Sequence, residues 1–398
     1  MPKHSTLHTL LSYPHLEQSW RGLFSSTRPT ARNTIGIDGI SINDFSTDPI
    51  AHLRNLSNHV RSPNFQFQKL KPHIIPKVNG KYRLICVPTV NDRIVQRSLL
   101  IFLSEKYQKQ LANNISFGFI KDRGIQKAAR TACFYRTKKQ WVLKTDIQSF
   151  FDNIDRNILA ASIKRSIKEK SLHNILISAS SCEIFSTSKS EKSKILALGI
   201  IEGHGIRQGM PLSPFFSNLI LSPFDHIIIK KKILAVRYAD DLIFFATSRS
   251  ECEDIFQLCQ ESLSTLGLHL PSISSSSKSI IYEPDQPAEF LGLGLCKKTA
   301  EYKISLLPEQ REKIRQRILD LGSIKELLAR KINLSSLGKA IDNRISGYLS
   351  AYDCCDNIED LERELHDLGM KVKRRVLFDE LKIPYSSLSS EARRFLGV

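Results

Sequence analysis

Residues 233–246 place two adjacent carboxylates between two short apolar runs, and this feature constrains the fold of the chain more than any other. The stretch reads ILAVRYADDLIFFA. Runs of this length, rich in Ile, Val, Phe and Tyr, predict buried β-strands, so Asp240 and Asp241 are expected at the turn of a tight hairpin. Neighbouring carboxylates repel each other there, and divalent cations such as Mg²⁺ would neutralise them. A solvated acidic turn between two core strands fits the same pattern.

The composition favours a polyanionic partner. Lys and Arg number 58 against 40 Asp and Glu, giving a net charge of +18 over 398 residues. An excess of this size indicates nucleic acid, although a generally basic surface is the alternative. The eight cysteines show no CxxC spacing, which predicts reduced thiols rather than disulfides or a zinc site. The absence of a leader or a membrane-length apolar run predicts a cytoplasmic protein with no membrane contact.

A third acidic residue ends a predicted strand in the stretch WVLKTDIQSFFDNI, residues 141–154. The apolar run stops at Asp146, and helical spacing begins near Asp155. A sheet can present the last residue of this strand beside the acidic turn at Asp240. Phe151 follows five residues later, where its ring could stack under a sugar or belong to the core.

Two further stretches carry polar groups suited to a nucleotide. Asn79-Gly80 predicts a hairpin turn between strands at residues 74–78 and 82–87. That hairpin carries three cations, Lys77, Lys81 and Arg83. They suit a triphosphate or a nucleic-acid backbone, or else form a solvated face with Lys protecting a sheet edge.

The loop GHGIRQGMPLSP, residues 203–214, precedes a predicted helix at 215–224. Gln208 offers a donor and an acceptor to a base or a sugar, and Gly209 would let a substrate approach the backbone. An ordinary loop before a helix is the alternative. Lys278 is the lone cation of the Ser-rich connection 270–278, and by itself it indicates nothing.

The remaining pattern is mostly helical. Apolar spacing predicts helices within residues 1–30, at 91–113 and at 253–266, where Gly267 is a C-cap signal. Residues 186–194, STSKSEKSK, are expected to form a polar loop, and residues 290–295 and 302–306 a hairpin. A separate helical domain is expected from Pro308. Its three apolar stripes are Ile314, Ile318 and Leu319; Leu337, Ile341, Ile345 and Leu349; and Leu361, Leu365, Leu368 and Val372.

Taken in order, these stretches resemble the bacterial reverse transcriptases, a group that includes group II intron, retron and phage-defence enzymes. The resemblance covers roughly residues 30–306 and is carried by these motifs: RNTIGIDGI, IPKVNGKYRLICVP followed by NDRIVQ, SFGFIKDRG, KTDIQSFFDNID, GIRQGMPLSPFFSN, YADD, LGLHLPSISSSSKS and FLGLGL. YADD alone is unspecific. YADD preceded by RQGxPLSPxxSN and DIxxFFDxI at this spacing is highly specific.

The resemblance implies an α+β right-hand polymerase with an antiparallel palm sheet, fingers and an α-helical thumb. The N-terminal extension and fingers would be residues 1–140. The palm would be residues 141–306, with a finger segment at about 185–215, and the thumb and tail residues 308–398.

The resemblance also implies RNA-directed DNA synthesis, in which dNTPs are added to a primer 3′-OH on an RNA template. Asp146, Asp240 and Asp241 would be the catalytic and metal-binding residues. Asp146 and Asp240 would be the principal ligands of two Mg²⁺ ions about 3.5 to 4 Å apart. One ion would lower the pKa of the primer hydroxyl, and the other would hold the triphosphate and the leaving pyrophosphate.

Each nucleotide-binding residue is likewise implied by the resemblance. Lys81 and Arg83 would hold the triphosphate, and Phe151 would block a ribose 2′-OH. Gln208 and Gly209 would line the nucleotide and template. Lys278 would lie near the pyrophosphate, although the SISSSSK spacing departs from the usual form of the family.

Departures from the known subgroups favour a stand-alone enzyme that copies a partner non-coding RNA in anti-phage defence. FLGLGLCKKTA lacks the retron VTG, and no His/Cys-rich endonuclease or RNase H segment follows the predicted thumb. Ser213-Pro214 differs from the diversity-generating group, which has glutamine in place of that proline. Two other functions stay open: an RNA-binding scaffold or intron maturase, and template-independent DNA synthesis at the same site. Primer, RNA identity and oligomeric state stay open as well.

Overall fold

The computed structural model describes residues 5–62, 65–76, 82–186 and 188–396. The chain divides into two compact units that interleave along the sequence. The first comprises Met1–Gly124, Thr145–Leu242 and Glu253–Ile280, and the second Ile125–Lys144, Ile243–Cys252 and Ile281–Val398. These borders are not those of the three consecutive regions expected from the sequence, so the division into fingers, palm and thumb stays a prediction.

The first unit begins with helices whose starts are set by caps. The Asp48 side chain accepts from the N–H of Ala51, with Pro49 at the first helical position, and Thr89 accepts from Asp92. Apolar faces then pack α2 against α4 and α5. This part contains α1 (Thr6–Leu10), α2 (Tyr13–Ser26), α3 (Ile42–Phe45), α4 (Pro49–Val60) and α5 (Val90–Leu111). The helices expected within residues 1–30 and at 91–113 are confirmed.

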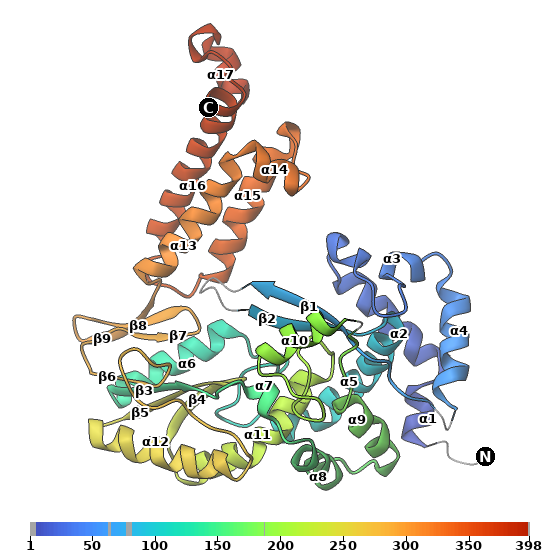
Figure 1. Ribbon diagram of the computed structural model, residues 1–398. Coiled ribbons are helices and arrows are strands. Elements are labelled where there is room, and N and C mark those ends of the chain that lie inside the picture. The colour runs from blue at the N-terminus through green and yellow to red at the C-terminus, as the bar shows by residue number, and fades with distance from the viewer. Residues whose placement is uncertain (1–4, 63–64, 77–81, 187, 397–398) are drawn as a thin grey trace. The chain divides into compact units, whose positions relative to one another are not determined.

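A two-stranded antiparallel ribbon follows α4 (Figure 1). β1 (Lys71–Pro76) pairs with β2 (Tyr82–Val87) in the register Lys71↔Val87 to Pro76↔Tyr82. The predicted hairpin is therefore confirmed, with a first strand that begins earlier than expected. Its expected turn and two of its three cations, Lys77 and Lys81, lie outside the described residues.

A four-stranded sheet carries the predicted acidic positions. Its order is β4 (Leu234–Tyr238), β5 (Asp241–Ala246), β3 (Trp141–Asp146) and β6 (Ile280–Tyr282). The three strands expected from apolar runs are present, because those runs are almost wholly buried. The helices around these strands are α7 (Phe150–Asn153), α8 (Arg156–Ser166), α9 (His173–Ser180), α11 (Ser213–Lys230) and α12 (Arg249–Ser264).

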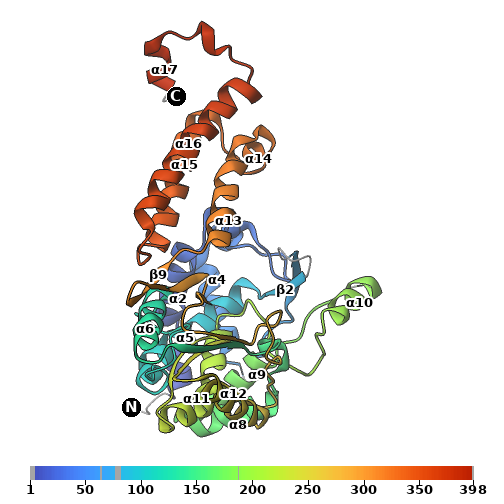
Figure 2. The same ribbon diagram turned by 90° about the vertical axis from the view of Figure 1, so that its left-hand side faces the viewer.

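One segment of the first unit is helical where the sequence predicts a loop. The expected polar loop at 186–194 is wrong, because α10 spans Lys189–Ala197. Ser188 caps this helix by accepting from the N–H of Glu191, and Ile195 is buried. In Figure 2, α10 lies at the end of two extended connections, apart from the other helices of its unit.

The second unit contains a long helix and a three-stranded antiparallel sheet. The helix is α6 (Ile125–Lys138), and the strands are β7 (Ala288–Phe290), β8 (Leu293–Lys298) and β9 (Glu301–Ser305). The predicted hairpin is confirmed, since β8 pairs with β9, but its first strand begins at Leu293 rather than at residue 290. Leu291 and Gly292 have φ of 54° and 77° and turn the chain between β7 and β8.

The C-terminal part of this unit is helical, as predicted. Pro308 begins the first helix, and α13 and α15 both pack along α16 (Figure 1). The apolar stripes are buried apart from Leu319 and Leu349, which are half-buried. The helices are α13 (Pro308–Leu319), α14 (Ile324–Ala329), α15 (Leu334–Ala351), α16 (Ile358–Arg374) and α17 (Ser390–Leu396). Among the described residues, no helix has the length and apolar character that crossing a membrane requires.

Candidate active site

Strand β3 delivers Asp146 to the acidic turn. Asp146 is the last residue of the strand and is 8% exposed. The N–H of the next residue, Ile147, donates to the carbonyl of Asp240 at 3.2 Å, and the N–H of Gln148 donates to His269 at 3.0 Å. The backbone itself therefore holds Asp146 beside Asp240, although the two are far apart in sequence.

The turn between β4 and β5 has an unusual backbone. Ala239 has φ of 57°, in the left-handed region, where a Cβ costs roughly 1–2 kcal/mol. Asp240 follows it, and Asp241 begins β5, both half-buried. A non-glycine residue persists in this conformation only where its surroundings hold it.

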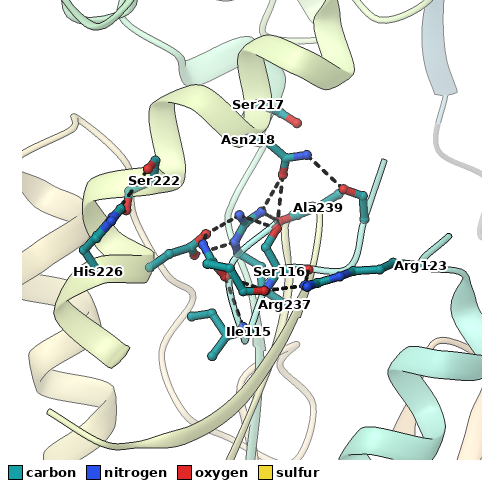
Figure 3. A network of polar contacts seen from close by, with 12 residues as sticks. Ile115, Ser116, Arg123, Ser217, Asn218, Ser222, His226, Arg237 and Ala239 are labelled. Carbon is teal, nitrogen blue, oxygen red and sulfur yellow. Dashed lines mark hydrogen bonds and ion pairs between the residues drawn. The ribbon is translucent and has the colours of Figure 1, made fainter. Parts of the chain in front are cut away.

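The buried side chain of Arg237 binds this turn (Figure 3). All five guanidinium N–H groups have acceptors. Nε and Nη2 donate to the two carboxylate oxygens of Asp225 at 2.7 and 2.5 Å. Nη1 donates to Asn218 Oδ1 at 3.1 Å and to the carbonyl of Ala239 at 3.2 Å. Nη2 also donates to Ser116 Oγ at 2.8 Å. One ion pair thus ties α11 and β4 to the residue before Asp240.

The SFGF segment packs against the same turn. The Phe117 N–H donates to the Arg237 carbonyl at 2.8 Å, and the Arg237 N–H donates to Ile115 at 2.7 Å. Gly118 lies so close that a Cβ there would be 2.4 Å from the nitrogen of Ala239. Only glycine fits this position, which explains the glycine of the motif in packing terms.

The charges around Asp240 are mutually coupled. Burial raises the pKa of the Asp240 carboxyl above its ordinary value, and the negative charge of Asp146 raises it further, while Lys278 and Arg83 lower it. The Lys278 ammonium donates to Asp146 Oδ2, although the lysine side chain is 71% exposed. Asp146, Asp240, Arg83 and Lys278 therefore act on one another in a single site.

The two coupled carboxylates fit a divalent cation. Asp146 Oδ1 is buried and has no hydrogen-bond partner among the described residues, which is costly for a carboxylate unless a cation approaches it. Across the described part of the chain, no three His, Cys, Asp or Glu side chains are grouped as a ready metal site. Mg²⁺ commonly binds through one or two carboxylates plus substrate phosphates, so Asp146 and Asp240 suffice for the fit. A ligand role for Asp241 stays a prediction.

The β1–β2 ribbon and the RQG loop are joined beside these residues. Arg83 Nε donates to Gln208 Oε1 at 2.7 Å, and the Cys86 N–H donates to the Gln208 carbonyl at 2.7 Å. Gly209 has φ of 108°, and a Cβ on it would lie 2.3 Å from the Cys86 carbonyl oxygen. The structure therefore brings Arg83, Gln208 and Gly209 together, and their roles in nucleotide binding stay predictions.

Phe151 is bonded to the same loop through its backbone. Its carbonyl accepts from the N–H of Ile206 at 2.8 Å. The ring of Phe150 is 2% exposed, whereas Phe151 is half-buried. The core aromatic of this pair is thus Phe150, and the Phe151 ring is left partly accessible.

A family model described as "Reverse transcriptase (RNA-dependent DNA polymerase)" matches residues 75–295, more than half of the chain. The chain belongs to the reverse transcriptase family. The α+β right-hand fold follows from this membership and is confirmed. The match includes all nine residues named for the site, of which Lys81 alone lies outside the described residues.

The curated relatives include a group II intron protein and a retron reverse transcriptase, which supports the resemblance to these two groups. Protein YkfC of Escherichia coli (strain K12) is 27% identical over 203 residues, 49% of this chain and 50% of that protein. Retron Ec83 reverse transcriptase of Escherichia coli is 27% identical over 199 residues, 49% of this chain and 57% of the relative. Group II intron-encoded protein LtrA of Lactococcus lactis subsp. cremoris is 24% identical over 209 residues, which is 50% of this chain and 32% of LtrA. The matches thus span about half or less of most of these relatives.

Solved structures give a weaker likeness. Apo telomerase from Candida tropicalis has a TM-score of 0.44 and 16% identity, covering 89% of this chain and 65% of that one. Because this score is low, the assignment to the reverse transcriptase family rests on the family match.

Sequence reasoning missed the residues that hold the reverse-transcriptase turn in place. Arg237 and Asp225 were not singled out, and neither was Asn218. One signal was present: Arg237 is the only charged residue in the apolar run before the acid pair. A charge inside a buried strand needs a buried partner, but the sequence does not identify which acid supplies it.

Proposed function

We propose that this chain is an RNA-directed DNA polymerase that adds deoxynucleotides to a primer 3′-OH with two Mg²⁺ ions. The observation that carries the proposal is the contact between the end of β3 and the β4–β5 turn, which places Asp146 beside Asp240. Arg83 and Lys278 bring positive charge to the same place. Coupled acids with flanking cations suit phosphoryl transfer, in which positioning and charge stabilisation provide most of the catalysis.

The acidic and basic residues of the site would have different roles in this reaction. Asp146 and Asp240 would hold the metal ions, with Asp241 helping to place them. Bound Mg²⁺ would lower the pKa of the primer hydroxyl and neutralise charge on the phosphates. Gln208 fixes Nε of Arg83, and Nη1 and Nη2 of the same guanidinium would grip phosphate.

Lys278 would have a second position available. Its ammonium pairs with Asp146 here, and its exposed, flexible side chain can reach the leaving pyrophosphate once the acids bind metal. Lys81 would add charge for the triphosphate, and Gly209 would allow close approach of the template.

Phe151 would select deoxynucleotides. Phe151 is half-buried, and its backbone carbonyl is bonded to Ile206, two residues before Gln208. A ring in that place would clash with a ribose 2′-OH, so Phe151→Ala should raise incorporation of ribonucleotides relative to deoxynucleotides. Steady-state kinetics with dGTP and GTP on one template would measure that ratio.

The biological role is proposed from the relatives. Retron and group II intron proteins suggest that this chain copies a partner non-coding RNA, and the net charge of +18 suits such a partner. We further propose that this occurs in the cytoplasm as part of anti-phage defence. Sequencing the nucleic acid that co-purifies with the protein would identify the template.

The decisive experiment is primer extension with Mg²⁺ and dNTPs on the co-purifying RNA. Asp146→Asn and Asp240→Asn should each lower the rate by at least about a thousandfold, since each removes a metal ligand. Asp254→Asn, at an exposed carboxylate on α12, is the matched control and should be unaffected. Absence of dNTP incorporation by the wild-type protein on that RNA overturns the proposal.

Two readouts separate the other functions. Products that do not match the template sequence would mean template-independent synthesis at this site. Full cellular function of an Asp146→Asn/Asp240→Asn variant would mean that the protein serves as an RNA-binding scaffold or maturase.

A further inference from the structure

Three of the eight cysteines meet at one cavity in the second unit. The cavity has a volume of about 370 Å³. Cys133 on α6 lines it together with Cys354 and Cys355, which are adjacent in the connection between α15 and α16. Cys133 Sγ donates to the carbonyl of Tyr302 on β9 at 3.2 Å, so that thiol is already engaged.

Cys354 differs from its neighbours in exposure and in ionisation. Cys133 and Cys355 are buried, whereas Cys354 is partly accessible. A hydrogen bond from Cys355 lowers the pKa of Cys354 to about 7, with Arg130 also lowering it against the effects of burial and Asp353. Burial raises the pKa of Cys133 to about 11, and the pKa of Cys355 is raised by Cys354 and by burial. The thiolate is the reactive form of cysteine, and a lowered pKa together with partial accessibility makes it available at neutral pH.

The charged groups at the cavity favour an anionic reactant. Arg130 on α6 and Lys303 on β9 line it, and Arg130 reaches Asp353 only at 3.9 Å. Asp356 is the acid on the lining, and it is already bound by Lys298 and by Ser305 Oγ. Two cations thus face the cavity with most of the opposing negative charge already paired.

We propose that Cys354 is a modification site that takes anionic low-molecular-weight disulfides. The Cys354 thiolate attacks one sulfur of the disulfide, whose S–S bond breaks. A mixed disulfide forms on Cys354, and the other half leaves as a thiolate that takes a proton from water. Cys354 is oxidised and the released half is reduced, so the exchange needs no further oxidant.

The location gives the modification a structural consequence. The connection holds the end of β9, because the Asp356 N–H donates to Ile304 at 2.8 Å. Asn357 exchanges two further hydrogen bonds with Leu306, at 2.9 and 3.1 Å. An adduct on Cys354 would be two residues from these contacts, so the modification would loosen the attachment of α15 and α16 to the sheet of the same unit.

The test uses the full-length protein and glutathione disulfide at pH 7, with adducts mapped by peptide mass spectrometry over time. Cys354 should react at least about tenfold faster than Cys296, the matched control, which is similarly accessible but whose pKa burial raises. Its rate should rise with pH to a plateau, with a midpoint near 7. Equal rates at Cys354 and Cys296 would overturn the proposal.

Two variants test the causes. Cys355→Ala should keep the adduct but move the midpoint upward, because alanine has no S–H to donate to the Cys354 thiolate. Arg130→Gln should slow reaction with glutathione disulfide more than with the neutral hydroxyethyl disulfide. If the charge of the disulfide makes no difference in the wild-type protein, the anionic preference is wrong.

Discussion

Arg237 and Asp225 form an ion pair in which both side chains are 1% exposed, and Arg237 precedes Asp240 by three residues. Removing one member leaves an uncompensated buried charge, which costs about 3–5 kcal/mol, whereas replacing both with apolar residues is often nearly neutral. The pair also supplies the donor to the Ala239 carbonyl. The effect of the Arg237–Asp225 pair on the free energy of unfolding can therefore be separated from its effect on the position of the β4–β5 turn.

Arg237→Leu should lower the free energy of unfolding by about 3–5 kcal/mol, and Arg237→Leu/Asp225→Leu by much less. The double variant should still extend primers at least about tenfold more slowly than wild type, because the turn has lost its donor. Urea unfolding and single-turnover extension measure the two effects. A double variant that regains both stability and rate would show that the pair does not position Asp240.

Gly209 and Gly203 offer a matched pair of substitutions in one loop. Both have positive φ, 108° and 79°, so alanine is strained at either, by roughly 1–2 kcal/mol. A Cβ at Gly209 would also meet the Cys86 carbonyl at 2.3 Å, whereas at Gly203 nothing lies within 4 Å. Gly209→Ala should therefore destabilise more and slow primer extension at least about tenfold by displacing Gln208 from Arg83. If Gly209→Ala and Gly203→Ala lose similar amounts of thermal stability and extension rate, the close contact between Gly209 and the Cys86 carbonyl does not hold Gln208 at Arg83.

At the scale of elements, the sequence predicted the strands that carry the acids because each is a short, almost fully buried apolar run. β3 ends at Asp146 and β5 begins at Asp241, while β4 ends at Tyr238, two residues before Asp240. α10 was missed because one buried residue, Ile195, and a Ser188 cap define it, and neither gives an apolar period. β7 and β8 were merged because the turn at Leu291 needs a left-handed non-glycine residue.

The contacts of the site were less predictable than its residues. Sequence could name Asp146, Asp240 and Gln208 through the family resemblance. It could not show that Gln208 fixes Arg83, or that Asp225 is the acid paired with Arg237, because these pairings depend on how α11, β2 and β4 pack. A charged residue in a buried strand indicates that a buried polar partner exists. Which residue is that partner depends on the tertiary structure.

Helix α5 carries a buried acid whose ionisation should affect stability. Asp92 is 3% exposed, and its Oδ2 accepts from the N–H of Gln68 at 3.1 Å. Burial raises its pKa to about 7, with Thr89 and Gln68 lowering it and Asp38 raising it. Because the folded-state pKa lies above the unfolded value, this contribution to stability is present at about pH 4 and is lost as the pH rises through about 7.

Asp92→Asn removes this titration while keeping an acceptor for Gln68. Relative to this variant, the wild-type free energy of unfolding should fall between pH 4 and pH 8 by an amount on the order of a few kcal/mol, since one pKa unit corresponds to about 1.4 kcal/mol. Denaturant unfolding at several pH values measures the difference, with Asp254→Asn as the exposed control. Parallel stability curves for wild type and Asp92→Asn would contradict the assignment.

At the scale of the whole molecule, the net charge of +18 opposes the local charge of the proposed site. Asp146 and Asp240 repel a phosphate backbone unless cations neutralise them, whereas the excess of Lys and Arg attracts it. Binding of RNA and extension of a primer should therefore depend on different residues. A variant that binds RNA but does not extend a primer therefore distinguishes a polymerase from a scaffold more directly than a test of RNA binding or of extension alone.

Binding to single-stranded RNA should weaken as salt is added. A plot of log Kd against log salt concentration should rise linearly, with a slope of about 0.7 per phosphate contacted. Contact with about five phosphates would weaken binding on the order of a hundredfold between 50 and 200 mM salt. Asp146→Asn/Asp240→Asn should keep this slope, because acidic residues release no counterions from RNA, and should lose extension. Fluorescence anisotropy without nucleotide measures the slope.

Salt-independent binding would contradict the electrostatic origin of affinity. A slope that changes in the double variant would mean that the acidic site itself governs RNA binding.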